Sequence, residues 1–467
     1  MLVFIIFLFK FVIIKNQNLQ KIMIFNPEIE QMPIEKLRII QNERLQNMLQ
    51  KVYKNVPFYK NAFDEAGVKL EEINGVEDLH KLPFTKKNHL RDNYPFGLFA
   101  EPKSNVIRLH CSSGTTGKPT VVGYTKNDIE LFSEVVARSL AASGCEPGMT
   151  LQNAYGYGLF TGGLGLHYGA EKLGMTVVPI SGGNTDKQIM LLKDFQADAI
   201  CATPSYALTV AEEIKKRGET LDNFNLKFAI LGSEPWSEAL RQEVEGSLNI
   251  KASNIYGLSE IIGPGVSNED YEEQGTGSYI WEDHFFPEIV DEKTGEPVPY
   301  GQPGVLVITT LTKEALPLVR YWTGDITTLT YEHSKKRTHI KMGPIIGRAD
   351  DMMIIRGVNF FHTQIADFIP EFPQLSPNYQ VVLTKPKNMD VVEVGFEINA
   401  DYFQEKGFDS DNLNEETNTE AQRIISNIHK KIRDNIGLGM NVKLFQTDQL
   451  PKSEGGKLNR IIDNREL

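Results

Sequence analysis

Residues 176–257 contain four short apolar runs: TVVPI at 176–180, DAICA at 198–202, FAILG at 228–232 and SNIYG at 253–257. Runs of this length are typical of buried strands. The segments between them, near 186–195, 205–217 and 237–248, have the spacing of amphipathic helices. Strands that alternate with helices predict right-handed βαβ units and a parallel sheet covered by helices. Ligands of such sheets bind beyond the carboxyl ends of the strands, where polar residues follow FAILG and SNIYG.

The sequence pattern changes on either side of this alternation. Residues 31–56 predict an amphipathic helix, and runs at 305–311 and 321–330 predict strands of a β-rich subdomain. The strands QVVLT and VVEVGFEI, with a helix at about 417–434, predict a further α+β unit. We therefore predict an α/β fold with a large N-terminal domain, 23–349, whose helix-covered sheets are largely parallel. A small α+β domain, 350–467, follows from a boundary at Asp350.

Length and composition are those of a globular protein, with 467 residues of which 41% are hydrophobic and 24% charged. The net charge of -12 argues against nucleic acid as a partner, because an acidic surface repels phosphate backbones. Cys111, Cys145 and Cys201 form no C-x-x-C pair, so we expect reduced thiols and a cytoplasmic protein.

The first fourteen residues are apolar except for Lys10. As a helix they would span about 21 Å, which is short of a bilayer's hydrocarbon core. We interpret residues 1–22 as a mis-assigned start ahead of Met23. A degenerate signal or anchor is the alternative.

The segment CSSGTTGKPTVVGYT at 111–125 is the strongest local signal of chemistry. Its small hydroxyl residues and glycines leave backbone N–H groups free to approach a polyphosphate, and Lys118 adds a mobile positive charge. It is not a Walker A loop, because GTTGK lacks the four-residue spacer before Gly-Lys. A flexible loop is the alternative. The predicted phosphate-binding residues are Ser112, Ser113, Gly114, Thr115, Thr116 and Lys118.

The string SSGTTGKPT resembles the phosphate loop of the acyl-adenylate-forming superfamily. VVGYT and YGYGLFTGGLGLHYGAE at 155–171 resemble one branch, the phenylacetate–CoA ligases. Further matches follow in order: GSEPW at 232–236, YGLSEIIGPGV at 256–266, WEDHFFPEI at 281–289, RYWTGD at 320–325, GRADDMMIIRGVNFF at 347–361 and PKSEGGKLNRIID at 451–463. The resemblance covers nearly all of residues 23–467. It implies that an aryl carboxylate is activated with ATP and Mg²⁺ to acyl-AMP and then transferred to CoA.

The resemblance implies roles at the nucleotide end of the site. Glu260 would be the carboxylate associated with Mg²⁺, holding the ion that bridges phosphate oxygens. Tyr256 and the turn at 232–235 would form the adenine slot, and Asp325 with Arg348 would bind the ribose. The predicted ATP-binding residues beyond the phosphate loop are Gly232, Ser233, Glu234, Pro235, Tyr256, Gly257, Ser259, Asp325, Ile345 and Arg348.

A moving C-terminal domain is also implied. Lys457 would bridge the substrate carboxylate and the α-phosphate during adenylation, and Lys452 is the alternative because an extra glycine precedes Lys457 here. Asp350 would be the hinge about which the C-terminal domain rotates. The rotation would remove Lys457 from the site and present another face of that domain for the attack by CoA. Arg356 and Gly357 are then candidates for the CoA channel.

Residues 155–171 carry the expected acid pocket. Tyr155, Tyr157 and Phe160 stand among six glycines, and aromatic faces with little surrounding bulk suit a flat ring. Leu166 would limit the depth of the pocket. Core packing is the alternative for these residues. The pattern does not separate phenylacetate, the expected acid, from hydroxyphenylacetate, indoleacetate or a benzoate.

Some positions depart from the branch: Tyr279 stands in place of His, Trp322 and Gly324 in place of two arginines, and His362 in place of Pro. They leave the acid specificity open. Nor do the histidines have the spacing of a metal site.

Two other functions are alternatives to the ligase. One is an adenylating protein that passes its acyl group to a carrier-protein thiol or an amine, and the other is a silent nucleotide-binding scaffold. Lys457, Glu260 and Asp325 together favour the enzyme, because binding alone would not need all three. The expected partners are the acid, ATP and CoA, without nucleic acid or stable membrane association, and a homodimer is left open.

Overall fold

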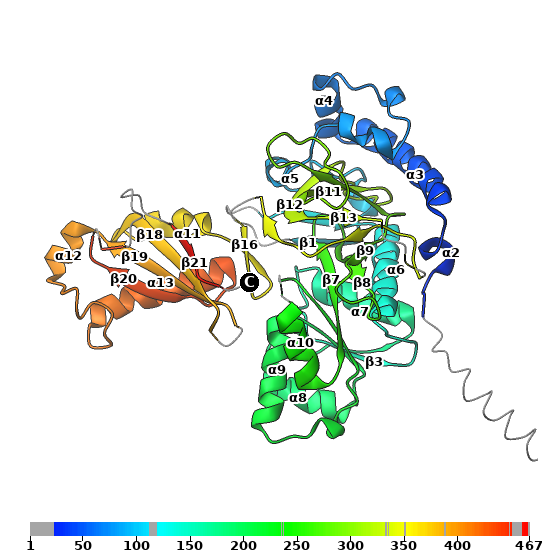
Figure 1. Ribbon diagram of the computed structural model, residues 1–467. Coiled ribbons are helices and arrows are strands. Elements are labelled where there is room, and N and C mark those ends of the chain that lie inside the picture. Colours follow the sequence, from blue (N-terminus) through cyan, green and yellow to red (C-terminus); the bar gives the residue numbers. More distant parts are fainter. Residues whose placement is uncertain are drawn as a thin grey trace, which may run out of the picture.

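A computed structural model of the chain describes residues 23–111, 119–234, 236, 238–331, 334, 336–349, 352–386, 389–447, 449–450 and 460–465. One large hydrophobic cluster draws on residues from Leu45 to Met342, and a separate one on residues from Met353 to Leu444. Figure 1 shows the two bodies side by side with strand β16 between them. The predicted fold class, α/β with a large N-terminal and a small C-terminal part, is confirmed. Asp350 lies outside the described residues, so the boundary and hinge there stay predictions.

The central sheet of the larger body has nine strands in the order β13-β14-β9-β8-β7-β6-β5-β3-β4. The neighbours β4, β3, β5, β6 and β7 pair in parallel, as the alternation predicts for β4, β5, β6 and β7. From β7 outward through β8, β9, β14 and β13 the pairing is antiparallel, so the sheet is mixed. Its strands are β3 (Thr150–Asn153), β4 (Thr176–Val178), β5 (Ala199–Ala202), β6 (Phe228–Gly232), β7 (Lys251–Leu258), β8 (Gly263–Glu269), β9 (Ser278–Ile280), β13 (Leu329–Thr330) and β14 (Lys341–Met342).

Helices cover both faces of the parallel part, because successive side chains of a strand point to opposite faces. Ala199 and Cys201 of β5 join the core that includes α6 and α7, whereas Ile200 and Ala202 pack with α8, α9 and α10. These helices are α6 (Lys126–Ala142), α7 (Gly162–Leu173), α8 (Thr185–Asp194), α9 (Pro204–Lys216) and α10 (Glu238–Leu248). The three helices predicted between the strands are confirmed.

The predicted β-rich subdomain is an antiparallel sheet in the order β10-β11-β12-β15. Its strands are β10 (Phe285–Val290), β11 (Gly304–Thr310), β12 (Tyr321–Thr327) and β15 (Gly347–Arg348). The pairing of β12 with β15 sets Asp325 directly opposite Arg348. A hairpin of β1 (Arg108–Cys111) and β2 (Val121–Tyr124) flanks the phosphate-loop segment.

The smaller body contains a four-stranded sheet in the order β20-β19-β18-β21 and a hairpin of β16 and β17. Its strands are β16 (Met352–Ile355), β17 (Val358–Phe361), β18 (Leu375–Thr384), β19 (Val391–Ile398), β20 (Asn441–Phe445) and β21 (Ile461–Asp463). Its helices are α11 (Thr363–Phe368), α12 (Ala400–Lys406) and α13 (Thr419–Ile436), together with a 3₁₀ turn at Ile369–Glu371.

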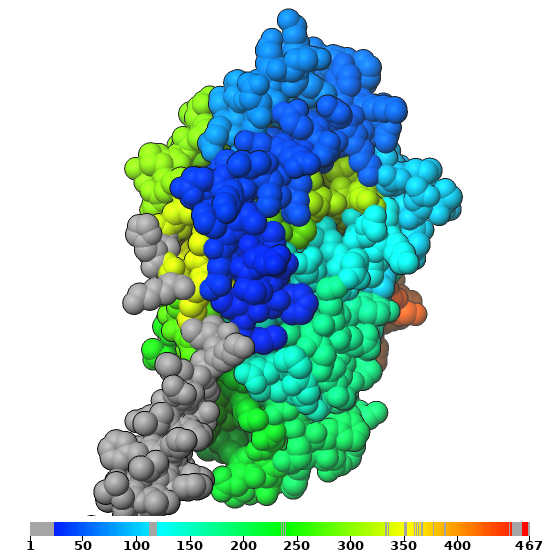
Figure 2. Space-filling model, turned by 90° about the vertical axis from the view of Figure 1, so that its right-hand side faces the viewer, coloured from blue at the N-terminus to red at the C-terminus, as the bar shows by residue number. Residues whose placement is uncertain are grey.

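The N-terminal segment lies across one face of the larger body, as Figure 2 shows. Glu30 is fully buried and accepts a hydrogen bond of 2.6 Å from Nε of Arg337. The helices here are α2 (Pro27–Glu30), α3 (Ile34–Asn55), α4 (Pro57–Glu65) and α5 (Lys87–Asp92), with 3₁₀ turns at Leu70–Glu72, Val76–Lys81 and Lys103–Asn105. A further 3₁₀ turn, Leu221–Asn223, lies between α9 and β6. Across the part of the chain that the structure describes, no helix combines the length and apolarity needed to cross a bilayer.

Two glycines of the 155–171 segment serve helix packing rather than a pocket. A Cβ on Gly165 would lie 2.2 Å from Cζ of Phe132, and one on Gly169 would lie 2.2 Å from Cγ1 of Val136. Carbon atoms in contact normally lie about 3.5–4.0 Å apart. Both glycines therefore let α7 pack closely against α6, so at these two positions the lack of a side chain serves a contact between helices.

Candidate active site

A cleft of about 1040 Å³ opens beyond the carboxyl ends of the parallel strands. Its walls come from the segments that follow β3, β5, β6 and β7, from β12 and β15, and from the tip of the β16–β17 hairpin. The polar residues after FAILG and SNIYG therefore share one space, as the topology rule predicts.

Most of the described residues that the sequence singles out line this cleft. From the nucleotide set these are Ser233, Glu234, Tyr256, Gly257, Ser259, Glu260, Asp325, Ile345 and Arg348, and from the other sets they are Tyr155, Phe160, Leu166, Arg356 and Gly357. Gly232 and Tyr157 are not among the lining residues. Outside the described residues lie Ser112, Ser113, Gly114, Thr115, Thr116, Lys118, Pro235, Asp350, Lys452 and Lys457, so their roles stay predictions.

Asp325 is held between two donors. Its Oδ2 accepts a hydrogen bond of 2.7 Å from the hydroxyl of Tyr256, and its Oδ1 forms an ion pair with Nη1 of Arg348. Arg348 is itself fixed by a hydrogen bond of 3.0 Å from Nη2 to the carbonyl oxygen of Thr323. Burial and the nearby Asp325 raise the pKa of Tyr256 well above its usual value, so the hydroxyl stays a donor at neutral pH. The cleft thus presents a preset carboxylate where the ribose is predicted to bind.

Glu260 stands in a tight turn between β7 and β8. The turn needs glycine, because a Cβ on Gly257 would lie 1.9 Å from the carbonyl oxygen of Gly263. Glu260 is only 4% exposed, and no described residue donates a hydrogen bond to its Oε1. Nζ of Lys87 lies 3.5 Å from that atom. A buried carboxylate oxygen without a hydrogen-bond donor is a fitting ligand for a divalent cation.

The described residues contain no group of three or more His, Cys, Asp or Glu side chains that could hold a metal ion by themselves. Mg²⁺ is often bound by one or two protein carboxylates, with substrate phosphates and water completing its shell, so Glu260 is compatible with such a site.

The aromatic end of the cleft is built on Tyr155. Its hydroxyl donates to the carbonyl oxygen of Ala202 at 2.6 Å, and burial raises the pKa of this group. Phe160 is 40% exposed and Leu166 is fully buried. Tyr157 instead has its hydroxyl 2.9 Å from Nδ2 of Asn153 and 3.2 Å from Nδ1 of His167.

Several lining residues were not singled out from the sequence. Among them are Lys86, Lys87, Thr161, Thr203, Ser205, Tyr206, Trp236, Met389 and Ile436, and Trp322, which the sequence marked only as a departure from the family pattern, also lines the cleft. The Lys-Lys pair at 86–87 was a readable signal, because two adjacent cations in a chain of net charge -12 are candidates for binding an anion. Most of the others had no local signal.

Glu234 is anchored at the start of α9. Its Oε1 accepts a hydrogen bond of 2.7 Å from the backbone N–H of Ser205, and burial raises the pKa of its carboxyl group. A carboxylate at a helix N-terminus satisfies one of the free N–H groups there. The segment after β6, which carries Glu234, is thereby tied to the segment after β5.

Arg356 and Gly357 form the two-residue turn of the β16–β17 hairpin, with φ angles of 48° and 77°. Two positive φ values favour glycine, and they match the twist of a tight hairpin. A Cβ on Gly357 would lie 3.2 Å from Cγ2 of Thr203, so the tip of the smaller body touches the larger one beside Ser233. Nη2 of Arg356 donates to the carbonyl oxygen of Gly439 at 2.6 Å.

Comparison with known proteins now bears on this site. Residues 35–312 match the family model of AMP-binding enzymes, and residues 357–465 match that of the AMP-binding enzyme C-terminal domain. A phenylacetate-coenzyme A ligase of Thermus thermophilus is 56% identical over 446 residues, which cover 95% of this chain and 100% of that protein. This chain belongs to the phenylacetate–CoA ligase family. A second member, from Pseudomonas putida, is 48% identical over 94% of this chain and 96% of its own length.

A 2-hydroxyisobutyryl-CoA ligase that is 25% identical to this chain has been solved in more than one domain arrangement. The complex with acyl-AMP and CoA in the thioesterification state has a TM-score of 0.87, over 94% of this chain and 92% of that one. The same protein scores 0.66 in an open conformation, which covers 94% of both chains. The two bodies of this chain therefore sit much as they do in the first of these structures.

Proposed function

We propose that this protein is an AMP-forming phenylacetate–CoA ligase. The acid and ATP form phenylacetyl-AMP and pyrophosphate, and the CoA thiol then displaces AMP to give phenylacetyl-CoA. One observation carries the proposal: a single cleft joins a buried carboxylate without a donor, a preset Asp325–Arg348 pair and an aromatic wall. The family membership supports the same reaction.

In the first step two anions must meet, and bringing them together calls for positioning and charge neutralisation. Asp325 would bind the ribose hydroxyls and Tyr256 would face the adenine, while Lys87 places an ammonium group beside Glu260. Glu260 would hold Mg²⁺, which supplies neutralising charge at the phosphate oxygens. Lys457, from the smaller body, is proposed to bridge the carboxylate and the α-phosphate.

For the second step we propose that CoA enters past the hairpin tip. Gly357 and Thr203 both line the cleft, and a Cβ on Gly357 would lie 3.2 Å from Cγ2 of Thr203, so a larger side chain at 357 would crowd the cleft at this point. The TM-score of 0.87 to a ligase in its thioesterification state supports this arrangement as the one for thioester formation. Asp350 is proposed as the hinge about which the smaller body turns between this arrangement and the one for adenylation.

Phenylacetate is proposed as the acid because the wall of Tyr155 and Phe160 suits a flat ring, and because relatives are named for it. We also propose a cytoplasmic location, which the three free cysteines support. Light scattering tests whether the protein forms a homodimer.

The test is exchange of labelled pyrophosphate into ATP, with phenylacetate, indoleacetate, benzoate and a short fatty acid compared. Phenylacetate should give the fastest exchange, and CoA should then cause release of AMP. Exchange without CoA-dependent release would favour transfer to a carrier-protein thiol or an amine. No exchange with any aromatic acid would refute the ligase.

A further inference from the structure

Lys313 is a buried lysine that the proposed mechanism does not use. It lies between β11 and β12 and is 2% exposed. Its Nζ donates a hydrogen bond of 2.9 Å to the carbonyl oxygen of Ile261 and lies 4.2 Å from the ring centroid of Tyr124. Among the described residues, none of the ion pairs includes Lys313.

A charge in this position is unfavourable for folding taken alone. Burial lowers the pKa of Lys313 to about 8, although Asp128 and Glu260 nearby favour its charged form. A methionine would fill the same space without the cost of removing an ammonium group from water. The residue type therefore points to a role other than filling the core.

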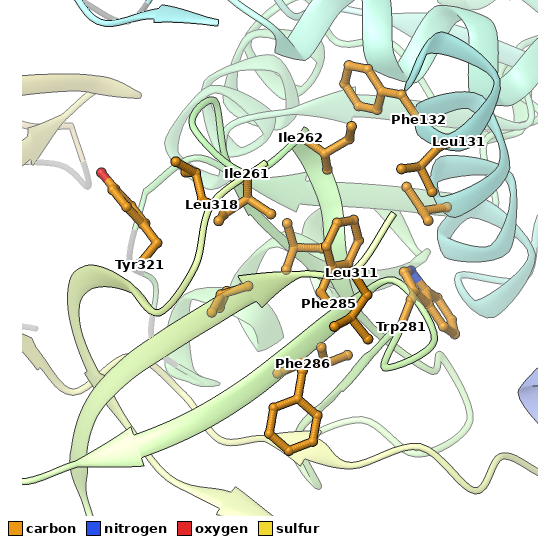
Figure 3. Close-up of a cluster of buried hydrophobic side chains, with 14 of the residues drawn as sticks. Leu131, Phe132, Ile261, Ile262, Trp281, Phe285, Phe286, Leu311, Leu318 and Tyr321 are labelled. Atoms are coloured by element: carbon orange, nitrogen blue, oxygen red, sulfur yellow. The ribbon is translucent and has the colours of Figure 1, made fainter. Parts of the chain in front are cut away.

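The atom that Lys313 binds belongs to the turn that carries Glu260. The carbonyl of Ile261 is held by Lys313, and the carbonyl of Ile262 accepts a hydrogen bond of 2.8 Å from the hydroxyl of Tyr124. Figure 3 shows Ile261 and Ile262 in the buried cluster that also contains Leu318. Both isoleucines are thus held by their carbonyls as well as by their side chains.

The other side of the turn is held as well. The hydroxyl oxygens of Ser259 and Thr161 lie 3.1 Å apart, within hydrogen-bond distance. The residues before and after Glu260 are therefore anchored, whereas Oε1 of Glu260 accepts no hydrogen bond from a described residue and lies 3.5 Å from Nζ of Lys87. This is the arrangement of a carboxylate that is held ready for a ligand.

We propose that Lys313 is a positioning residue, which fixes the turn that carries Glu260 by holding the carbonyl of Ile261. The inference rests on the proposed function, because it takes Glu260 to be the ligand that this turn presents to the cation. Two carbonyls of this turn, those of Ile261 and Ile262, accept hydrogen bonds from residues that are distant in the chain, Lys313 and Tyr124. The long lysine side chain brings its ammonium group within hydrogen-bond distance of that of Ile261.

The test compares Lys313→Met with Lys341→Met. Lys341 is the matched control, because it is 3% exposed, lies 4.9 Å from the ring of Tyr279 and donates to Glu273 at 3.0 Å, but does not line the cleft. Hydrogen exchange of the amides at 256–268 is measured by mass spectrometry on the unliganded proteins. We expect Lys313→Met to speed exchange there by about tenfold, and Lys341→Met to leave Ile261 and Ile262 unchanged.

Pyrophosphate exchange supplies the second readout. In Lys313→Met the Mg²⁺ concentration for half-maximal rate should rise by about tenfold, while KM for the acid changes less than about twofold. If that variant does not fold, Lys313→Gln, which keeps a donor but not the charge, should still raise it by about threefold. Unchanged amide exchange and Mg²⁺ dependence in a folded variant would overturn the proposal. Because amide exchange needs no turnover, an inactive wild-type protein would refute the proposed function without deciding this inference.

Discussion

Replacing Tyr256 by phenylalanine removes one hydroxyl from the nucleotide end of the cleft and changes little else. That hydroxyl lies 2.7 Å from Oδ2 of Asp325, whose other oxygen pairs with Arg348. A hydrogen bond to a charged group contributes about 1.5–3 kcal/mol net. Without it, Asp325 is held from one side only and is expected to rotate away from the ribose hydroxyls.

The expected cost to ATP binding is about one hydrogen bond to the ribose, roughly 1.4 kcal/mol, which corresponds to a tenfold weaker affinity. KM for ATP in pyrophosphate exchange should therefore rise about tenfold in Tyr256→Phe. KM for phenylacetate should stay within about twofold, because Tyr155 and Phe160 are unchanged.

Tyr331→Phe is the matched control. The hydroxyl of Tyr331 also donates to a carboxylate at 2.7 Å, that of Glu282, but this residue does not line the cleft. Urea unfolding should show a loss of stability in both variants, the smaller in Tyr331→Phe because that side chain is 36% exposed. Equal changes of KM for ATP in the two variants would refute the assignment of Asp325 and Tyr256 to the nucleotide site.

Three further outcomes are expected. Gly357→Leu should slow CoA-dependent AMP release by on the order of 100-fold and spare pyrophosphate exchange, because even a Cβ at this position would lie 3.2 Å from Cγ2 of Thr203. Equal slowing of both steps would contradict the assignment of Gly357 to the CoA channel. Gly169→Ala should cost about 1–3 kcal/mol in urea unfolding, because its Cβ would lie 2.2 Å from Val136, and adding Val136→Ala should restore part of that stability. Burial lowers the pKa of His284 to about 4, so between pH 4 and about 6.5 the unfolded chain binds more protons than the folded one. The contribution of His284 to stability should therefore be full above pH ~6.5 and be lost as the pH falls toward 4. A urea midpoint that does not change over this range would contradict the prediction.

Local patterns in the sequence were sufficient for the alternating strands and helices of residues 176–257 and for the cleft residues that belong to motifs. Strand β6 is Phe228–Gly232 and helix α9 is Pro204–Lys216, within a residue of the predicted limits, because apolar periodicity is a property of neighbouring residues. The parallel direction of β4, β5, β6 and β7 followed from the same alternation, whereas β3, which lies between β5 and β4, was not predicted. The alternation placed Glu234 and Glu260 at one edge without knowledge of any distance.

What only the tertiary structure decided depends on partners far apart in the chain. The antiparallel direction from β8 onward, the packing of Gly169 on Val136 and the turning of Tyr157 toward His167 are set by contacts that no local window contains. The pairing of Lys87 with Glu260 and the support of Ile261 by Lys313 are of the same kind. Residue types at motif positions show which chemistry a chain can perform, whereas the shape and charge around them arise when distant segments pack together.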